Sequence, residues 1–280
     1  MDIVSKKPDR EFSFDHAFWS HDGYTNDASG YSVPDPGSNY TDQNKVWELL
    51  GTGILENMWK GINSCAFAYG QTGSGKSYSF FGYGANRGIV PMAAEKMFQR
   101  VTANTDASLS FQITFQMVEI YMEKINDLLV EPAKRAGNLE VKQTKDLIWV
   151  DGARKEPVQN YEQINKYMSM GDKNRSIAST AMNATSSRAH TIVTIEMVKV
   201  TKSGGKESKT TSILNLVDLA GSEKQNQAQT EGDRLKEGNA INMSLTALGN
   251  VISALADIST GKTKPGSHIP YRDSTLTRML

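Results

Sequence analysis

Residues 67–78 read FAYGQTGSGKSY and contain the most specific motif of the chain. Within it, Gly70 to Ser77 match the pattern G-x-x-x-x-G-K-[ST], in which glycines let backbone N–H groups converge on phosphate oxygens. Lys76 would add a positive charge for the outer phosphates, and the Ser77 hydroxyl would bind Mg²⁺. A glycine-rich turn can match by accident, but this one lies between an apolar run, SCAFAY, and a helical segment beginning near Lys76. The stretch therefore predicts a nucleotide-binding loop.

A second apolar run ends in an acid that fits the metal side of such a site. The run ILNLVD ends in Asp218, which begins the sequence D-x-x-G through Gly221. An aspartate after a strand is more often a turn former or a helix cap. In the D-x-x-G form, however, the glycine N–H can sense a terminal phosphate and move when that phosphate leaves. The two motifs together predict a nucleotide-dependent switch.

A polar cluster before a strand offers the other half of a phosphate sensor. It runs from Asn183 to His190 and reads NATSSRAH. A loop rich in serine and threonine is usually only a loop. Beside Asp218, Ser187 becomes a candidate for the metal shell, and Arg188 is free to pair with an acid such as Glu223.

The remaining pattern predicts one mixed-sheet α/β domain. Residues 19–42 are rich in Ser, Gly, Asp, Asn and Pro, which favours a surface loop. Helices are expected from Thr41 or Asp42 to Gly61 and after Pro91, and Phe111 to Met117 alternate as in a strand. Further strands are expected at LEVKQ and LIWV, and a long hairpin where HTIVTIEMVKV and KTTSILNLVDLA flank KSGGKES.

A long amphipathic helix is expected from Arg234 to Ile258. Its apolar side is formed by Leu235, Ile241, Leu245, Leu248, Ile252 and Leu255.

Composition limits the class of protein. The chain has 280 residues, 38% hydrophobic and 22% charged, with 31 basic and 31 acidic residues, so it is unlike a polycation that coats nucleic acid. The single cysteine, Cys65, excludes an internal disulfide and is expected in the core. We find no apolar run that approaches membrane-spanning length and no signal peptide, and expect a soluble intracellular protein.

Five segments together resemble the kinesin motor domain in order and spacing. They are FAYGQTGSGKSY, NATSSRAH, DLAGSE, RLKEGNAINMSLTALGNVISALA and HIPYRDSTLTRML, and they cover nearly the whole chain. FSFDHAFWSH, Tyr78 and VEIYMEKINDLL further resemble the class-three, Unc-104-like kinesins. The resemblance implies a P-loop NTPase three-layer sandwich with a mixed central sheet, and a cytoplasmic ATPase that moves on microtubules of the cytoskeleton.

The resemblance also implies roles for individual residues. Ser186, Ser187 and Arg188 would belong to switch I and Asp218 to Glu223 to switch II, with an Arg188–Glu223 salt bridge closing on the γ-phosphate. The helix after Glu231 would be a relay lying on tubulin. The residues expected to bind ATP are Gly70, Gln71, Thr72, Gly73, Ser74, Gly75, Lys76, Ser77, Tyr78, Asn183 and Ser186.

Catalytic and partner-binding residues follow from the same resemblance. Mg²⁺ would be held by Ser77, Ser187 and, through water, Asp218. Catalysis would rest on Lys76, Ser187, Arg188, Gly221 and Glu223. The residues that could pair with acidic tubulin are Lys224, Lys236, Lys262, Lys264, Arg272 and Arg278.

The sequence departs from the family at two kinds of place. Ala189 replaces a serine of switch I, and Met243 replaces a lysine of the relay helix, which predicts altered turnover and a weaker basic face. We also expect the domain to be truncated at both ends, without the family's first and last central strands or a dimerisation region.

Two other functions stay open. D-x-x-G and the phosphate loop also occur in GTPase switches, but the N-K-x-D segment that commonly selects guanine is not found: Asn165-Lys166 is followed by Tyr-Met. A kinesin-like protein that binds microtubules without hydrolysing ATP would also fit Ala189 and the thinned basic face.

Overall fold

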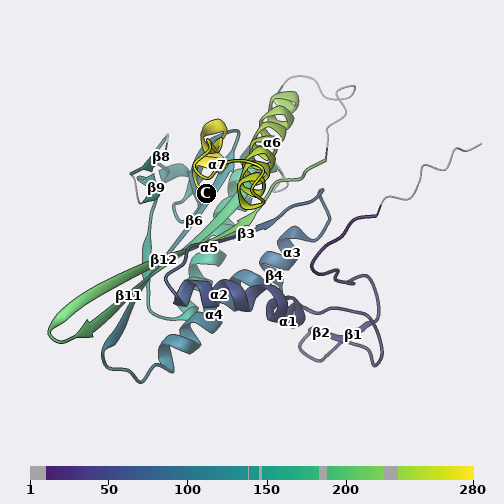
Figure 1. The fold of residues 1–280 in the computed structure, drawn as a ribbon. Helices are drawn as coiled ribbons and strands as arrows, with labels where there is room; N and C mark the ends of the chain where they lie inside the picture. The colour runs from purple at the N-terminus through teal and green to yellow at the C-terminus, as the bar shows by residue number, and fades with distance from the viewer. Residues whose placement is uncertain (1–10, 138, 145–146, 183–187, 224–232) are drawn as a thin grey trace, which may run out of the picture.

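The computed structural model describes residues 11–137, 139–144, 147–182, 188–223 and 233–280, with the backbone alone at 178–182 and 233–236. Within these ranges a six-stranded sheet forms the centre of the molecule (Figure 1). Its strands, in spatial order, are β10 (Glu156–Val158), β6 (Leu109–Tyr121), β11 (His190–Ser203), β12 (Lys206–Asp218) and β3 (Ser64–Ala68), with β7 (Lys124–Asp127) also paired to β6. β12 and β3 run parallel and the other pairs antiparallel, so the predicted mixed sheet is confirmed.

Smaller elements surround this sheet. Three two-stranded sheets pair β1 (Tyr24–Asn26) with β2 (Ser32–Pro34), β4 (Gly82–Tyr83) with β5 (Asn86–Arg87), and β8 (Glu140–Gln143) with β9 (Ile148–Asp151). The α-helices are α1 (Gln43–Val46), α2 (Thr52–Trp59), α3 (Lys76–Phe80), α4 (Ile89–Thr102), α5 (Tyr161–Met182), α6 (Asp233–Ser259) and α7 (Thr275–Arg278). A π-helical turn (Trp47–Gly51) joins α1 to α2, and 3₁₀ turns lie at Pro132–Lys134 and Tyr271–Asp273.

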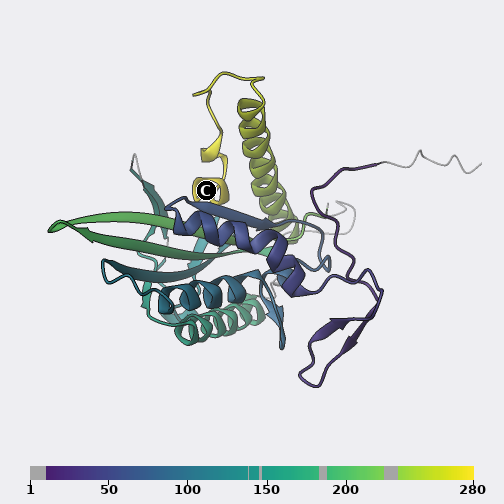
Figure 2. The same cartoon turned by 60° about the horizontal axis from the view of Figure 1, so that its bottom comes forward.

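Alternation along the strands builds a core on each face of the sheet. On β6, Phe115 and Met117 enter the core shared with α2, α4 and α5, whereas Val118 and Ile120 enter the core shared with α6 and α7. Figure 2 shows α4 and α5 on one side of the sheet and α6 rising from the other. The three-layer arrangement predicted from the sequence is therefore confirmed.

The long hairpin is also confirmed. β11 and β12 pair from Thr191↔Asp218 to Ser203↔Lys206. Gly204 and Gly205 connect them with φ of +56° and +76°, values that glycine adopts without steric cost. This register carries Asp218 to the edge of the sheet where β3 ends, because Asp218 lies opposite Ala68 in the parallel pair.

One prediction about exposure is wrong, and one about a surface loop is only partly right. Residues 19–42 do not form loop throughout, because β1 and β2 pair within them and residues 27–31 turn on the Asp27 carboxylate, which accepts the N–H groups of Ser29 and Tyr31. Cys65 is exposed and not in the core. It lies on β3, which ends the order of the described sheet, and lines an open groove with Asn63 and Ser64.

Helix α5 has no counterpart in the sequence interpretation. Its sequence is mostly polar, and Gly171 lies in its middle, which disfavours a helix locally. In the fold that glycine permits close packing, since a Cβ at Gly171 would lie 2.4 Å from Sδ of Met117 on β6. Contact with the sheet therefore explains a helix that local propensity does not predict.

Helix α6 confirms the predicted helix but only part of its predicted apolar side. Ile241 and Leu248 are buried, whereas Ile252 and Leu255 are 49% and 42% exposed. The side chain of Leu235 lies outside the described part of the helix. The inner face of α6 instead includes two polar residues, Glu237 and Ser244.

Candidate functional site

The glycine-rich loop joins β3 to α3, as expected. Gly73 and Gly75 have φ of +79° and +87°, a left-handed conformation that side chains other than glycine rarely adopt. Gln71 to Gly75 are exposed. The loop thus presents backbone to solvent at the end of the parallel pair β3 and β12.

Lys76 folds back over this loop. Its Nζ donates hydrogen bonds to the carbonyl oxygens of Gly70, at 3.0 Å, and Gln71, at 2.9 Å. The ammonium group therefore lies against the loop. From there it can exchange these carbonyls for an anionic ligand without moving away from the loop.

Ser77, in the first turn of α3, contacts Asp218 at the end of β12. The Ser77 Oγ donates to Oδ2 of Asp218 at 2.5 Å, and Asp218 is 5% exposed. Burial raises the pKa of Asp218, and the Ser77 hydrogen bond opposes that effect. The other carboxylate oxygen, Oδ1, is buried and has no hydrogen-bond partner within the described residues.

This unpartnered oxygen provides a test of whether Mg²⁺ fits the site. A buried acceptor without a donor is costly, and a hard cation ligated by oxygen removes that cost. The neighbouring Ser77 hydroxyl is a second oxygen ligand. One carboxylate is enough here, since Mg²⁺ is usually bound by one or two carboxylates together with phosphate oxygens and water. The residues present therefore fit the ion expected from the sequence.

The D-x-x-G segment is attached to the phosphate loop. Leu219 N–H donates to the Ala68 carbonyl at 3.2 Å, and Ser222 N–H to the Gly70 carbonyl at 3.1 Å. Glu223 accepts two hydrogen bonds from Thr72, at 2.8 Å from its N–H and 2.5 Å from its hydroxyl. Partial burial opposes the change, but the bonds from Thr72 hold the pKa of Glu223 below its usual range.

Gly221 lies in the middle of this contact. A Cβ at this position would be 2.4–2.6 Å from the Glu223 carboxylate oxygens and the Thr72 hydroxyl. A larger residue at this position would therefore displace the Glu223 carboxylate or the Thr72 hydroxyl.

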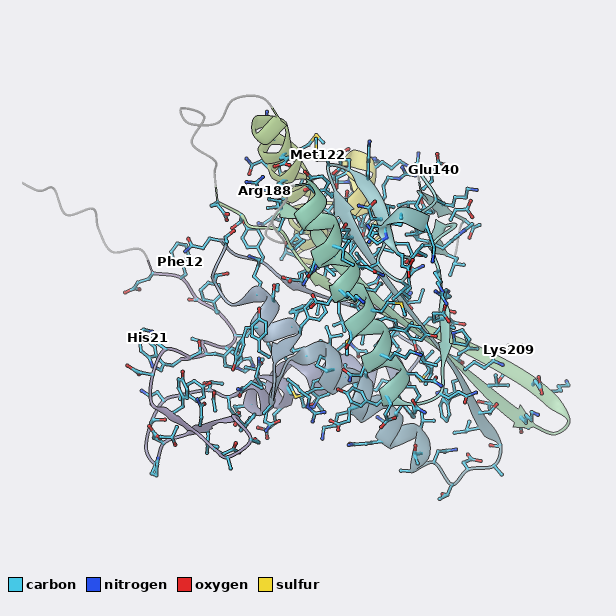
Figure 3. All side chains as sticks on the ribbon, turned by 180° about the vertical axis from the view of Figure 1, so that it is seen from behind. Phe12, His21, Met122, Glu140, Arg188 and Lys209 are labelled. Carbon is cyan, nitrogen blue, oxygen red and sulfur yellow. The ribbon has the colours of Figure 1, made fainter. Side chains whose placement is uncertain are left out.

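The expected salt bridge between Arg188 and Glu223 is not formed. Arg188 instead pairs with Glu237 at the start of α6, and Glu237 also accepts a hydrogen bond from the Tyr121 hydroxyl. Figure 3 shows Arg188 beside this end of α6. The reason is that Glu223 is held by Thr72, while the buried Glu237 requires a cation of its own.

His190 takes part in a contact that the sequence interpretation missed. Its Nδ1 accepts the N–H of Ala220 at 3.0 Å, and its Nε2 lies 2.8 Å from Oγ of Ser244 on α6. Burial lowers the pKa of His190 to about 4, so the ring is neutral near pH 7. The position of His190 at the end of the polar cluster, where a strand begins, is the local signal that could have indicated this role.

Comparison with protein families covers almost the whole chain. The profile described as the kinesin motor domain matches residues 2–280. This chain belongs to the kinesin motor domain family. The P-loop NTPase fold expected from the sequence is therefore shown.

Relatives of this kinesin motor domain are much longer. It is 46% identical over 273 residues to kinesin-like protein KIF28 of Mus musculus, covering 97% of this chain and 26% of the relative. It is 41% identical over 278 residues to KIF13A of Mus musculus, covering 98% and 15%. These relatives are consistent with the class-three resemblance, and the chain spans about a quarter or less of their length.

Solved structures agree with this assignment. A KIF14 dimer in its two-heads-bound state, with AMP-PNP and in complex with a microtubule, has a TM-score of 0.76 at 40% identity, covering 86% of this chain and 68% of that one. A structure described as a fast kinesin has a TM-score of 0.76 at 35% identity, covering 91% and 71%.

Some expected site residues of this kinesin motor domain cannot be placed. Asn183, Ser186 and Ser187 lie outside the described residues. Tyr78 is described: its ring stacks on Tyr83 with centroids 6.0 Å apart, and burial followed by hydrogen bonding to Tyr40 raises its pKa to about 12.

The expected tubulin-facing cations are only partly described. Lys224 and the side chain of Lys236 lie outside the described part of the chain. Lys262, Lys264, Arg272 and Arg278 are exposed. Lys262 lies 3.5 Å from Asp257, and Arg278 donates to the Val141 carbonyl at 2.8 Å, so these two are already engaged within the domain.

One segment qualifies the expectation about membranes. Residues Glu237–Ser259 of α6 are long and apolar enough to cross a bilayer by length and composition alone. A helix with one face on a protein core passes the same test, and Ile241, Leu248 and Val251 pack in this way. The segment is therefore weak evidence for a membrane span.

Proposed function

We propose that this chain is the ATP-hydrolysing, microtubule-binding domain of a motor protein. One observation carries the proposal: Ser77 contacts Asp218 and Thr72 contacts Glu223, so the phosphate loop and the D-x-x-G segment form one site. Movement of a bound terminal phosphate would therefore change the contacts of both the phosphate loop and the D-x-x-G segment. The structural neighbour with AMP-PNP and a microtubule supports the choice of nucleotide and partner.

The nucleotide would lie along Gly70–Ser77. Backbone N–H groups and Lys76 would hold the phosphates, and Lys76 would exchange its present carbonyl partners for phosphate oxygens. Ser77, Ser187, which lies outside the described residues, and, through water, Asp218 would hold Mg²⁺, which when bound neutralises charge between the last two phosphates. Catalysis is then mainly positioning and charge neutralisation.

Closure of the site would exchange two partners. Arg188 would leave Glu237, and Glu223 would leave Thr72, so that the two could pair and enclose the lytic water. The exchange keeps one ion pair but leaves the buried Glu237 without its cation and Thr72 without its acceptor, so the bound nucleotide must supply the free energy that favours the closed arrangement. Because Glu237 lies on α6, loss of its contact with Arg188 would change how the start of that helix is held. We propose that α6 faces tubulin together with Lys262, Lys264 and Arg272.

The experiment is phosphate release from ATP with and without microtubules. The wild-type chain should release phosphate faster with microtubules, and Lys76→Ala should lose that activity by roughly 100-fold or more, as expected for removal of one essential donor. Lys209→Ala, an exposed lysine on the β11–β12 hairpin (Figure 3), is the matched control and should retain it.

A second candidate is a kinesin-like protein that binds microtubules without hydrolysis. The observation that favours it is that Glu223 and Arg188 already have other partners, so closure needs both to be exchanged. Microtubule cosedimentation without phosphate release would select this candidate. Release from GTP in preference to ATP would instead select a GTPase-type switch.

A further inference from the structure

A chain of hydrogen bonds crosses from the D-x-x-G segment to α6. Ala220 N–H donates to Nδ1 of His190, Nε2 of His190 contacts Oγ of Ser244, and Ser244 Oγ donates to the Ile241 carbonyl. The distances are 3.0, 2.8 and 2.8 Å. The chain thus joins three segments that are distant in the sequence.

The protons in this chain have one consistent arrangement. A backbone N–H can only donate, so Nδ1 of His190 must carry a lone pair. The Ser244 hydroxyl proton is directed to the Ile241 carbonyl, so Ser244 Oγ accepts from an Nε2–H. The ring is therefore neutral and is a rigid link with an acceptor at one end and a donor at the other.

Water cannot replace this link. Ala220, His190 and Ser244 are 0%, 3% and 2% exposed. Removal of either end would leave a buried polar group unpaired, which is more costly than loss of an exposed hydrogen bond.

The backbone N–H groups of the D-x-x-G segment donate in two directions. Leu219 and Ser222 donate their N–H groups to β3 and the phosphate loop, whereas Ala220, between them, donates to His190. A shift of this segment toward or away from a phosphate must therefore change the bond to His190 or move His190 with it.

Ser244 lies at the right place on α6 to receive such a shift. Glu237, Ile241, Ser244, Leu248 and Val251 are all buried and recur at spacings of four and three, which places them on one helical face. Ser244 is two turns beyond Glu237, so it contacts the sheet at a second point along the helix.

We propose that His190 is a positioning residue that couples the D-x-x-G segment to α6 through Ser244. The inference rests on the proposed function, because it assigns the route by which a nucleotide at the phosphate loop changes the helix proposed to face tubulin. His190 fixes the position of Ala220 relative to α6.

The test is amide hydrogen exchange of residues 219–223 and 237–251, with and without a non-hydrolysable ATP analogue. In the wild type the analogue should change exchange in both segments. In Ser244→Ala and His190→Asn it should still change exchange in 219–223, but the response of α6 should fall about tenfold, as expected for loss of one buried hydrogen bond. His190→Asn keeps an acceptor for Ala220 and loses the reach to Ser244.

The matched control is Ser253→Ala, which deletes an exposed hydroxyl from the same helix and should respond like the wild type. An unchanged α6 response in Ser244→Ala, or no α6 response in the wild type, overturns the coupling. A merely structural role of Ser244 would lower stability without separating the two segments. If the wild type shows the coupled response but releases no phosphate with microtubules, the proposed motor function fails while the coupling stands.

Discussion

His190 makes the stability of this domain depend on pH in a direction that can be calculated. Its pKa is lowered by burial from an ordinary value of 6.5 to about 4. Between pH 4 and 6.5 the histidine is therefore protonated in the unfolded chain and neutral in the folded chain. Stability contributed by the neutral ring is fully present above pH 6.5 and is lost as the pH falls toward 4.

The magnitude follows from the two pKa values. Each pH unit between them is worth about 1.36 kcal/mol. The span from 6.5 to about 4 thus amounts to roughly 3 kcal/mol, a large part of the 5–15 kcal/mol typical of a domain. Asp218 and Glu119, whose pKa values are raised by burial, act in the opposite direction. The contribution of His190 is therefore obtained from the difference in the free energy of unfolding between the wild type and a variant that lacks this histidine.

The assay is urea unfolding of the wild type and His190→Asn at several pH values between 7.5 and 4.5. The stability advantage of the wild type over the variant should shrink by about 2–3 kcal/mol across this range. His21→Asn, at an exposed histidine in the N-terminal segment (Figure 3), controls for removal of a histidine as such. A difference that stays constant or grows on acidification would refute the buried neutral ring.

Three other changes test the site and a strained turn. Ser77→Ala should abolish the dependence of nucleotide affinity on Mg²⁺, because the hydroxyl beside Asp218 is lost. Ser77→Thr keeps a hydroxyl and should retain this dependence, and equal behaviour of the two variants contradicts the assignment. Gly221→Ala should weaken the Thr72–Glu223 contact by about 1–3 kcal/mol while folding is retained. Because the proposed closure requires Glu223 to leave Thr72, this change should favour closure and speed phosphate release, and a normal rate would show that the close approach is not needed. Met122 has φ of +50°, so Met122→Asn should raise the free energy of unfolding by about 1 kcal/mol in urea titrations, and a variant no more stable than Met122→Ala would argue against strain.

Local sequence predicted the elements whose backbone geometry depends on residue type. The phosphate loop follows from Gly73 and Gly75, which adopt left-handed φ, and the long hairpin follows from Gly204 and Gly205 between two alternating runs. Asp42 caps α1 by accepting the Lys45 N–H, as expected for a helix beginning there. These features involve residues a few positions apart, so neighbours in the chain are enough to specify them.

Burial was harder to predict because it depends on what packs against each element. Cys65 and Leu255 are apolar in sequence terms, but each is exposed in the fold. Conversely, the polar helix α5 is stabilised by close contact between Gly171 and Met117. Periodicity reports which residues share a face and not which face is covered.

A phosphate loop, an acid at the end of the neighbouring strand and a long amphipathic helix can all be read from the residues in order. The partners of the polar side chains follow from the folded arrangement: Arg188 pairs with Glu237, 49 residues away, Glu223 with Thr72, 151 residues away, and His190 joins Ala220 to Ser244. The physical reason is that backbone conformation is set by near neighbours, whereas the partner of a charged or polar side chain is set by which strand ends and helix faces the fold brings together.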